Sequence, residues 1–197
     1  MQTWNLVFLL GFAIYVGIRG VFAEKTRANV QAERRVDLQE RVLIFAVFIG
    51  CLLLPVLYLF TSLLAFADYK LPPFLPWFGV VAMPFALWLF FRSHADLGEN
   101  WSQTLEIRVG HRLVTGGVYT STRHPMYSAI LLFSLAQGLL LANWLAGWSG
   151  LVATSLMFML RMPREEKMMS DTFGEDYRRY MARTGRLFPR SDRRTPS

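Results

Sequence analysis

Long blocks without charged side chains alternate with short polar segments along this chain. No Asp, Glu, Lys or Arg occurs in residues 1–18, 42–67, 71–91 and 125–160. A hydrocarbon core about 30 Å thick is crossed by roughly 20 apolar helical residues, so each of the first three blocks predicts one membrane helix. Uninterrupted apolar blocks of this length are not typical of soluble amphipathic helices or strands.

The fourth block is too long for a single membrane crossing. Its 36 residues would form a helix of about 54 Å, nearly twice the thickness of the hydrocarbon core. We therefore expect the chain to turn around Asn143-Trp144, with Gly147 and Gly150 nearby. The predicted fold is an all-α polytopic membrane bundle of about five transmembrane helices.

Composition supports a membrane protein and excludes several other classes. Hydrophobic residues make up 53% of the chain and charged residues 18%. The single cysteine, Cys51, excludes a disulfide framework and a cluster of thiolate zinc ligands. The net charge of +7 could suit nucleic acid, but the basic residues gather between the apolar blocks. That placement predicts a lipid bilayer as the partner and no nucleic acid.

The distribution of basic residues predicts the orientation in the membrane. With five crossings, residues 24–41, 92–124 and 161–197 lie on one side, and they hold nineteen of the 21 Lys and Arg residues. The other side receives only Lys70. By the positive-inside rule the basic side is cytoplasmic. We expect the N-terminus outside, a retained first span without the basic start of a signal peptide, and any active site on the cytoplasmic face.

These features divide the chain into three parts. Residues 1–91 carry the first three helices and the charged linker 24–41, which we expect to be a solvated connecting helix without a catalytic role. Residues 92–189 form the candidate catalytic region, with a loop, a helical hairpin and C-terminal helices on the cytoplasmic side. Residues 190–197 are expected to be a flexible basic tail.

Side chains suited to chemistry are dense in residues 111–127. The glycine pair 116–117 permits a tight turn, and Pro125 fits the first turn of a helix. Backbone N–H groups at such a helix start favour a bound carboxylate, and Tyr119 and Tyr127 could flank a planar ring. The simpler interpretation is a structural helix cap with tyrosines as interfacial anchors.

A second set of charged residues follows the fourth apolar block. Arg161 and Glu165 share a helix face, and Arg161 lies at the mouth of the bundle, where an ionisable group is a candidate for function. Glu165 and Glu166 offer a carboxylate for a cationic ligand. The alternative is a weak surface ion pair on an amphipathic helix that lies on lipid. The three histidines lack a metal-binding pattern, so no metal site is predicted.

The motifs together resemble a known family. They read HxLVTxGxYxxxRHPxY at 111–127, RxxxEE at 161–166, FGxxYxxY at 173–180 and RxxP at 186–189. In this order they are similar to the isoprenylcysteine carboxyl methyltransferase family and its phospholipid methyltransferase relatives, in their bacterial form. The resemblance covers roughly residues 97–189. It implies an S-adenosylmethionine-dependent methyltransferase in the bacterial inner membrane, acting on a lipophilic, isoprenylcysteine-like acceptor.

The resemblance also implies the site residues. Cofactor contacts would fall on His111, Arg112, Leu113, Val114, Tyr119, His124, Pro125, Met126, Tyr127 and Glu165. Arg161 would face the substrate carboxylate, so Arg161 and Glu165 are the predicted catalytic residues. Methyl transfer to an ionised carboxylate needs no general base, because catalysis rests on proximity and orientation. Gly117 replaces a proline that many relatives carry, which predicts a looser loop.

Two other functions stay open at this point. Membrane sterol and enone reductases resemble the same GxYxxxRHPxY segment and use NADPH, although the paired acids Glu165 and Glu166 argue against that reading. A non-catalytic membrane scaffold would retain the fold and bind neither cofactor. The acceptor could be a carboxylate, an amine or a thiol, and Arg161 favours an acid.

Overall fold

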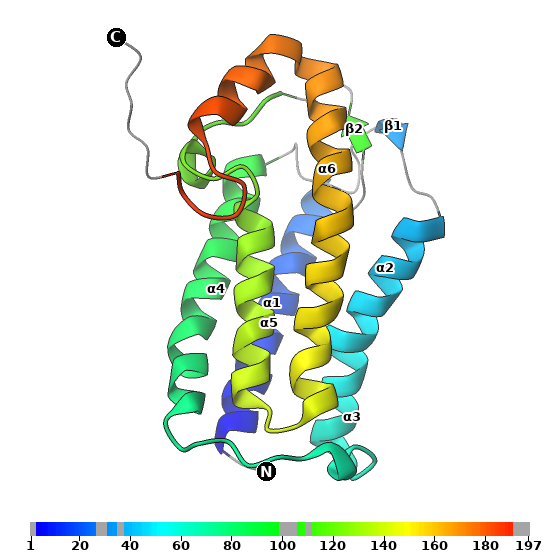
Figure 1. Ribbon diagram of the computed structural model, residues 1–197, viewed down its shortest axis with the longest axis vertical. Coiled ribbons are helices and arrows are strands. Elements are labelled where there is room, and N and C mark those ends of the chain that lie inside the picture. Colours follow the sequence, from blue (N-terminus) through cyan, green and yellow to red (C-terminus); the bar gives the residue numbers. More distant parts are fainter. Residues whose placement is uncertain (1–2, 27–30, 35–37, 99–105, 109–111, 191–197) are drawn as a thin grey trace.

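Long apolar helices lie side by side in the computed structural model, which describes residues 3–26, 31–34, 38–98, 106–108 and 112–190 (Figure 1). The predicted helical membrane bundle is confirmed. The helices are α1 (Thr3–Thr26), α2 (Leu38–Phe48), α3 (Leu54–Phe60), α4 (Leu75–Leu97), α5 (Pro125–Leu140) and α6 (Trp144–Arg183). A π-helical turn, η1 (Ile49–Leu53), joins α2 to α3, and short 3-10 turns occur at η2 (Ala65–Ala67) and η4 (Gly117–Thr120).

The surface of the bundle is apolar where lipid would surround it. Four helical stretches in the described part of the chain are long and apolar enough to cross a membrane: Thr3–Lys25, Leu38–Phe60, Leu75–Leu97 and Trp144–Arg183. The fifth predicted span, α5, is a shorter apolar helix of 16 residues. Large side chains such as Leu10, Phe78 and Val152 point outward. An exposed apolar surface of this extent marks a membrane interaction.

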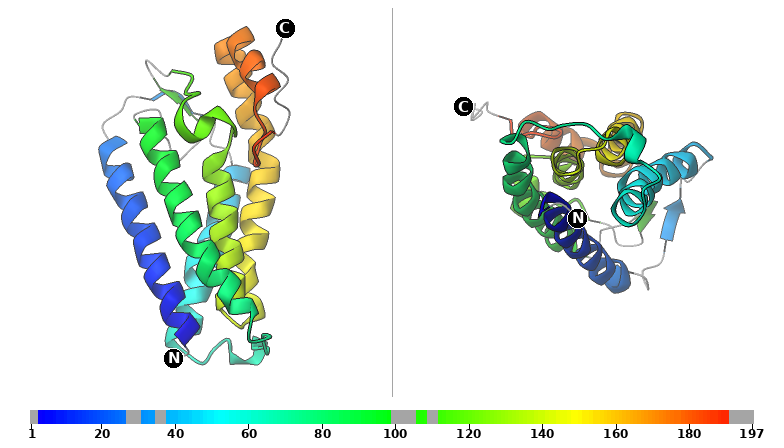
Figure 2. Two further views of the ribbon diagram at one scale, coloured as in Figure 1. Left: turned by 90° about the vertical axis from the view of Figure 1, so that its left-hand side faces the viewer. Right: turned by 90° about the horizontal axis from the view of Figure 1, so that it is seen from below.

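The helices pack around a core of aliphatic and aromatic side chains. Phe8 of α1, Met83 of α4, Phe133 of α5 and Ala146 of α6 are all buried in one cluster. Figure 2 shows α1, α4, α5 and α6 alongside one another, α5 running opposite to the other three, with α2 and α3 beside them. The shared core fixes the depth of each helix, and with it the depth of the charged residues at the helix ends.

The predicted turn in the fourth apolar block is confirmed. Asn143 lies between α5 and α6 and is the N-cap of α6, because its Oδ1 accepts hydrogen bonds from the backbone N–H groups of Leu145 and Ala146 at 3.1 and 2.9 Å. Gly147 and Gly150 follow the turn, as expected. They lie inside α6 and are buried there, Gly147 against the carbonyl of Leu141.

The linker is not the continuous helix that the charge pattern predicted. α1 ends at Thr26, and a short strand β1 (Gln31–Arg34) pairs antiparallel with β2 (Glu106–Arg108) before α2 begins at Leu38. The chain must reverse direction between α1 and α2, and a continuous helix cannot make that reversal. The pairing of β1 with β2 gives backbone N–H and C=O groups of this connection hydrogen-bond partners.

The two ends of the bundle differ in character. α1 begins at the end that also holds the α3–α4 connection and the α5–α6 turn, as Figure 1 shows. The opposite end holds η4, the start of α5 and the second part of α6. Residues 144–160 of α6 carry no charged side chain and are long enough to cross the hydrocarbon core, whereas 161–183 extend beyond it. The charged residues of α6 therefore collect at one end of the bundle.

Candidate active site

A kink at Gly174 folds the end of α6 back toward the bundle. Gly174 has φ of +53°, a conformation that suits glycine because it has no Cβ. After the kink the chain returns to the segment that precedes α5. There the N–H of Arg123 donates to the carbonyl of Gly185 at 2.8 Å, and the N–H of His124 donates to that of Arg186 at 2.9 Å. The FGxxYxxY and RxxP motifs thus close the chain onto the RHP motif.

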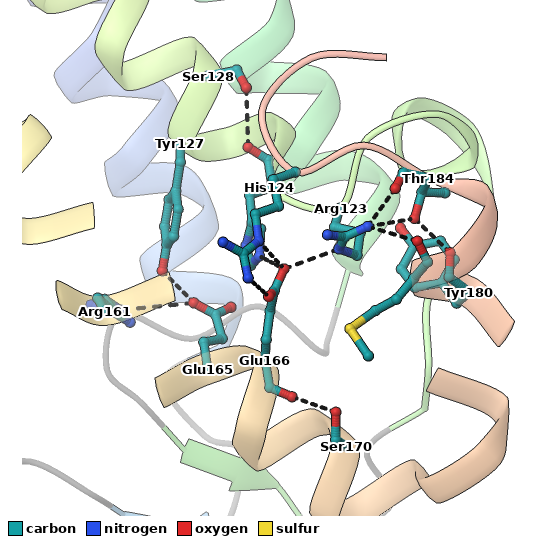
Figure 3. A network of polar contacts seen from close by, with 12 residues as sticks. Arg123, His124, Tyr127, Ser128, Arg161, Glu165, Glu166, Ser170, Tyr180 and Thr184 are labelled. Atoms are coloured by element: carbon teal, nitrogen blue, oxygen red, sulfur yellow. Dashed lines mark hydrogen bonds and ion pairs between the residues drawn. The ribbon is translucent and has the colours of Figure 1, made fainter. Parts of the chain in front are cut away.

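Glu166 lies at the centre of the contacts that hold this closure. Its Oε1 is 3.0 Å from Nε of Arg123 and 3.3 Å from Nε2 of His124, and its Oε2 is 2.7 Å from Nη2 of Arg186. Arg123 also donates to the carbonyls of Met181 and Thr184. We call Arg123, His124, Glu166, Thr184 and Arg186 the C-terminal latch, and Figure 3 labels the first four of them.

The charge balance of the latch favours the ionised form of Glu166. Burial alone would raise the pKa of this carboxyl, but hydrogen bonds from His124, Arg186 and Arg123 outweigh burial and lower its pKa to about 2. Glu166 lies in the charged extension of α6, beyond the uncharged stretch that ends at Leu160. At neutral pH it is a carboxylate whose acceptor capacity is used within the protein.

Glu165 has a different environment although it is the next residue. The hydroxyl of Tyr127 donates a hydrogen bond to its Oε2, and Nε of Arg161 lies 4.0 Å from the same oxygen. The Glu165 side chain is 31% exposed, whereas that of Glu166 is 8% exposed. Of the two adjacent acids, Glu165 is therefore the one that a cationic ligand can reach.

Arg161 is enclosed between two helices. Its side chain is only 10% exposed, and its Nη1 lies 3.2 Å from Oε1 of Glu40 on α2, which is 4% exposed. From the sequence we expect no catalytic role for the 24–41 linker, and this contact between Glu40 and Arg161 was not foreseen. A signal was present, because Glu40 and Arg161 each stand at the edge of an uncharged block on the same predicted side of the membrane and therefore at similar depth.

The two predicted tyrosines, Tyr119 and Tyr127, are both buried. The ring of Tyr127 is stacked on Phe158 at 4.0 Å between centroids and on His124 at 5.2 Å, so neighbouring rings of the protein cover its faces. That Tyr127 also flanks a planar ligand ring stays a prediction. Tyr119 is buried, its hydroxyl donates to the carbonyl of Ser93 at 3.3 Å, and burial raises its pKa well above the ordinary value. Tyr119 is therefore neutral.

The remaining predicted residues lie along the path into α5. Pro125 is buried in the first turn of α5, and Met126 beside it is half-buried. Leu113 and Val114 are half-buried and Arg112 is exposed in the segment that leads to η4. His111 lies outside the described residues. The structure thus brings His124, Tyr127, Arg161 and Glu165 together, with the segment that precedes η4 leading toward them.

Comparison with known proteins gives a family for this part of the chain. The sequence profile of the isoprenylcysteine carboxyl methyltransferase (ICMT) family matches residues 80–171. These residues match the ICMT family, as the motifs predicted. The match includes most of α4, the segment around η4, α5, and α6 as far as Asp171. It therefore contains Arg123, His124, Tyr127, Arg161 and both paired acids.

Individual relatives point to the same family. Protein-S-isoprenylcysteine O-methyltransferase B of Arabidopsis thaliana is 34% identical over 44% of this chain and 45% of its own length. The Dictyostelium discoideum enzyme is 30% identical over 62% of this chain and 50% of its own length, and the human enzyme is 36% identical over 44% and 31%. The chain thus spans about half or less of the length of these relatives.

A solved structure extends the likeness to the fold. The eukaryotic intramembrane Ras methyltransferase ICMT superposes on 93% of this chain and 67% of its own, with a TM-score of 0.57 and 22% sequence identity. The likeness includes the helices N-terminal to the matched residues, so α1 to α3 share the ICMT-like arrangement. With its apolar helices, the chain is an integral membrane protein.

The ICMT-like loop that contains Gly117 is held firmly in this chain. Gly117 has φ of +59°, which proline cannot adopt, and the carboxylate of Asp96 accepts a hydrogen bond from the N–H of Val118 at 2.9 Å. This hydrogen bond joins the loop to α4. A Cβ at position 117 would lie 2.0 Å from Oδ2 of Asp96.

Replacing Gly117 by alanine is expected to destabilise this loop. The positive φ costs an L-residue about 1–2 kcal/mol, and Asp96 must also move away from the new methyl group. We expect a lower unfolding temperature and faster proteolysis between α4 and α5. The matched control is Gly116→Ala, since Gly116 has an extended conformation and open space around it. Equal stability of the two variants would contradict this explanation.

Proposed function

We propose that this chain is an integral membrane methyltransferase that uses S-adenosylmethionine to methylate the carboxylate of a lipophilic, isoprenylcysteine-like acceptor. The observation that carries the proposal is the juxtaposition of an accessible carboxylate, Glu165, and an enclosed guanidinium, Arg161, 4.0 Å apart. The Glu165 carboxylate suits the ammonium group of the methyl donor, and the Arg161 guanidinium suits an acidic acceptor. Both lie where the uncharged stretch of α6 ends, so a lipid-soluble acceptor can reach them from the bilayer.

The residues present fit the proposed methyl donor. Glu165 is exposed enough to accept the donor's α-ammonium in a charge-assisted pair, while Tyr127 holds the carboxylate in place from the protein side. His124 supports the ring of Tyr127 and stands at the start of α5. We assign the same pocket the residues His111, Arg112, Leu113, Val114, Tyr119, Pro125 and Met126.

The chemistry requires little from the protein beyond orientation. When bound, S-adenosylmethionine would supply a sulfonium methyl group: a carboxylate oxygen bonds to the methyl carbon as the S–C bond breaks, and the thioether S-adenosylhomocysteine leaves. An acceptor carboxylate is already ionised at neutral pH, so no general base is needed. Arg161 would hold that carboxylate, and the apolar side chains around it would exclude water and strengthen the ion pair.

Binding of the donor and turnover of matched acceptors together test the proposal. We expect saturable binding of S-adenosylmethionine to the protein in nanodiscs and methylation of a farnesylated cysteine acid. Farnesylated amine and thiol acceptors of equal size should be poor substrates, because neither carries a carboxylate for Arg161. Preferred methylation of the amine or the thiol would assign a different acceptor class to the same pocket.

Replacing Arg161 by alanine is expected to separate the two binding functions. The variant should use the farnesylated acid at least about tenfold less efficiently, since a charge-assisted contact contributes about 1.5–3 kcal/mol. Affinity for S-adenosylmethionine should change by less than about threefold, because Tyr127 still holds Glu165. The measurements are acceptor kcat/KM and donor Kd on the same preparation. An equal loss of both would contradict the assigned roles.

We also propose that the site faces the cytoplasm of a bacterial inner membrane. Nineteen of the 21 Lys and Arg residues belong to segments that the sequence predicts on one side of the membrane. The described parts of these segments lie at the site's end of the bundle, and α1 begins at the opposite end (Figure 1). The proposal predicts that a cysteine placed in the α3–α4 connection is labelled by an impermeant reagent in intact cells, whereas one placed near Arg178 is not.

A further inference from the structure

Glu40 is a buried carboxylate in the N-terminal part of the chain, outside residues 80–171. It lies in the first turn of α2 and its side chain is 4% exposed. Its Oε1 is 3.2 Å from Nη1 of Arg161 on α6. The side chains of Leu43 and Met157 line the same small cleft. Burying an ionised carboxylate costs free energy unless the group is paired. The pairing with Arg161 is therefore what makes the burial of Glu40 tolerable.

Glu40 and Glu165 hold Arg161 from two different helices. Glu40 approaches Nη1 from α2, and Glu165 lies nearest Nε on α6 itself. The guanidinium is planar, and these ion pairs, at 3.2 Å from Nη1 and 4.0 Å from Nε, attract two different nitrogens toward two different helices, which limits the orientations of its plane. A long side chain that would otherwise sample several rotamers is thereby presented in one orientation before an acceptor arrives.

We propose that Glu40 is a positioning residue that fixes the Arg161 guanidinium and thereby makes the site selective for an anionic acceptor. The inference rests on the proposed function and deepens it, because it assigns the N-terminal helices a share in acceptor selection. Glu40 acts through Arg161 and takes no part in the methyl transfer itself. With Glu40 absent, Arg161 keeps its charge but loses the fixed orientation that favours a carboxylate over a neutral polar group.

The experiment compares two ligands that differ only in charge. The probes are N-acetyl-S-farnesylcysteine and its carboxamide, and the readout is the ratio of their inhibition constants against a common acceptor. We expect the wild type to prefer the acid by about tenfold or more. In Glu40→Ala that preference should fall to within about threefold, while the affinity for S-adenosylmethionine changes less than threefold. Glu40→Gln, which keeps an oxygen for Nη1, should be intermediate.

A merely structural role for Glu40 would give a different pattern. General loosening of the α2–α6 packing would weaken acid and amide alike, whereas loss of positioning weakens only the acid. In an Arg161→Ala background, Glu40→Ala should have little further effect on the ratio, because coupled residues are not additive. Asp171→Ala is the matched control, since it removes an exposed carboxylate of α6 that pairs with Lys167 at 3.1 Å.

The outcomes separate this inference from the proposed function. If the wild type binds S-adenosylmethionine and methylates the farnesylated acid, but the acid-to-amide ratio is unchanged in Glu40→Ala and Glu40→Gln, the role of Glu40 is overturned and the function stands. If the wild type neither binds the donor nor methylates any acceptor, the proposed function fails, and the inference that rests on it fails with it.

Discussion

Replacing Glu165 by alanine is expected to weaken the binding of S-adenosylmethionine at least about 30-fold. Glu165 is the more exposed of the two adjacent acids, and its carboxylate is already oriented by the hydroxyl of Tyr127. Truncating one partner of a hydrogen-bonded charge pair in a largely enclosed site costs about 2–5 kcal/mol. That cost corresponds to at least about a 30-fold weaker Kd, measured by calorimetry or by radioligand binding in nanodiscs.

The control for this prediction is an acid of the same helix in an exposed setting. Glu175 pairs with Arg178 at 3.5 Å, both side chains are exposed, and Glu175→Ala should leave the donor Kd unchanged. Unaltered binding in Glu165→Ala would remove Glu165 from the pocket. Saturable binding of NADPH in place of S-adenosylmethionine would instead favour a reductase, and binding of neither ligand by the folded wild type would favour a scaffold.

The helical bundle was predictable because the membrane imposes a simple rule on sequence. Charged residues are excluded from the hydrocarbon core, so the edges of the uncharged blocks located the helices, and the 36-residue length of the last block required a turn. Asn143 fitted that turn because its short side chain can cap a helix start. The β1–β2 pairing could not be read in the same way, since its strands are short and polar and lie far apart in sequence.

The sequence predicted which residues form the site, but not which partner each of the two adjacent acids contacts. Glu165 and Glu166 are adjacent in sequence, yet neighbouring residues of a helix point about 100° apart. One therefore meets Tyr127 and the other meets the returning C-terminal segment. Which acid faces which partner depends on the kink at Gly174 and on how the chain returns, and both follow from tertiary packing.

The contact between Glu40 and Arg161 shows a related limit. The two residues are far apart in sequence, and the mixture of four acidic and five basic residues in the linker has the composition of a solvated segment. Only the packing of α2 against α6 selects Glu40 from the four acids and buries it beside Arg161. Depth in the membrane can be read from the sequence, but the direction in which a side chain points at that depth requires the packed bundle.

Replacing Glu166 by glutamine is expected to open the C-terminal latch and to give the largest loss of stability among these variants. The substitution leaves Arg123, which is 9% exposed, without its carboxylate partner. Removing one partner of a buried ion pair costs about 3–5 kcal/mol. We expect a lower unfolding temperature in nanodiscs and rapid tryptic cleavage after Arg186, because the segment that pairs with residues 121–124 is released.

A second member of the latch and the pH dependence sharpen this test. Arg186→Ala removes a partner that is 57% exposed, so solvent compensates and the loss of unfolding free energy should stay below about 1 kcal/mol.

Because the pKa of Glu166 is lowered to about 2 in the folded state, its contribution to stability is complete above the ordinary pKa of a glutamic acid and disappears as the pH falls through about 2. The difference between wild type and Glu166→Gln should therefore shrink in acid. A Glu166→Gln variant as stable and protease-resistant as the wild type at pH 7 would show that the latch does not hold the C-terminal segment.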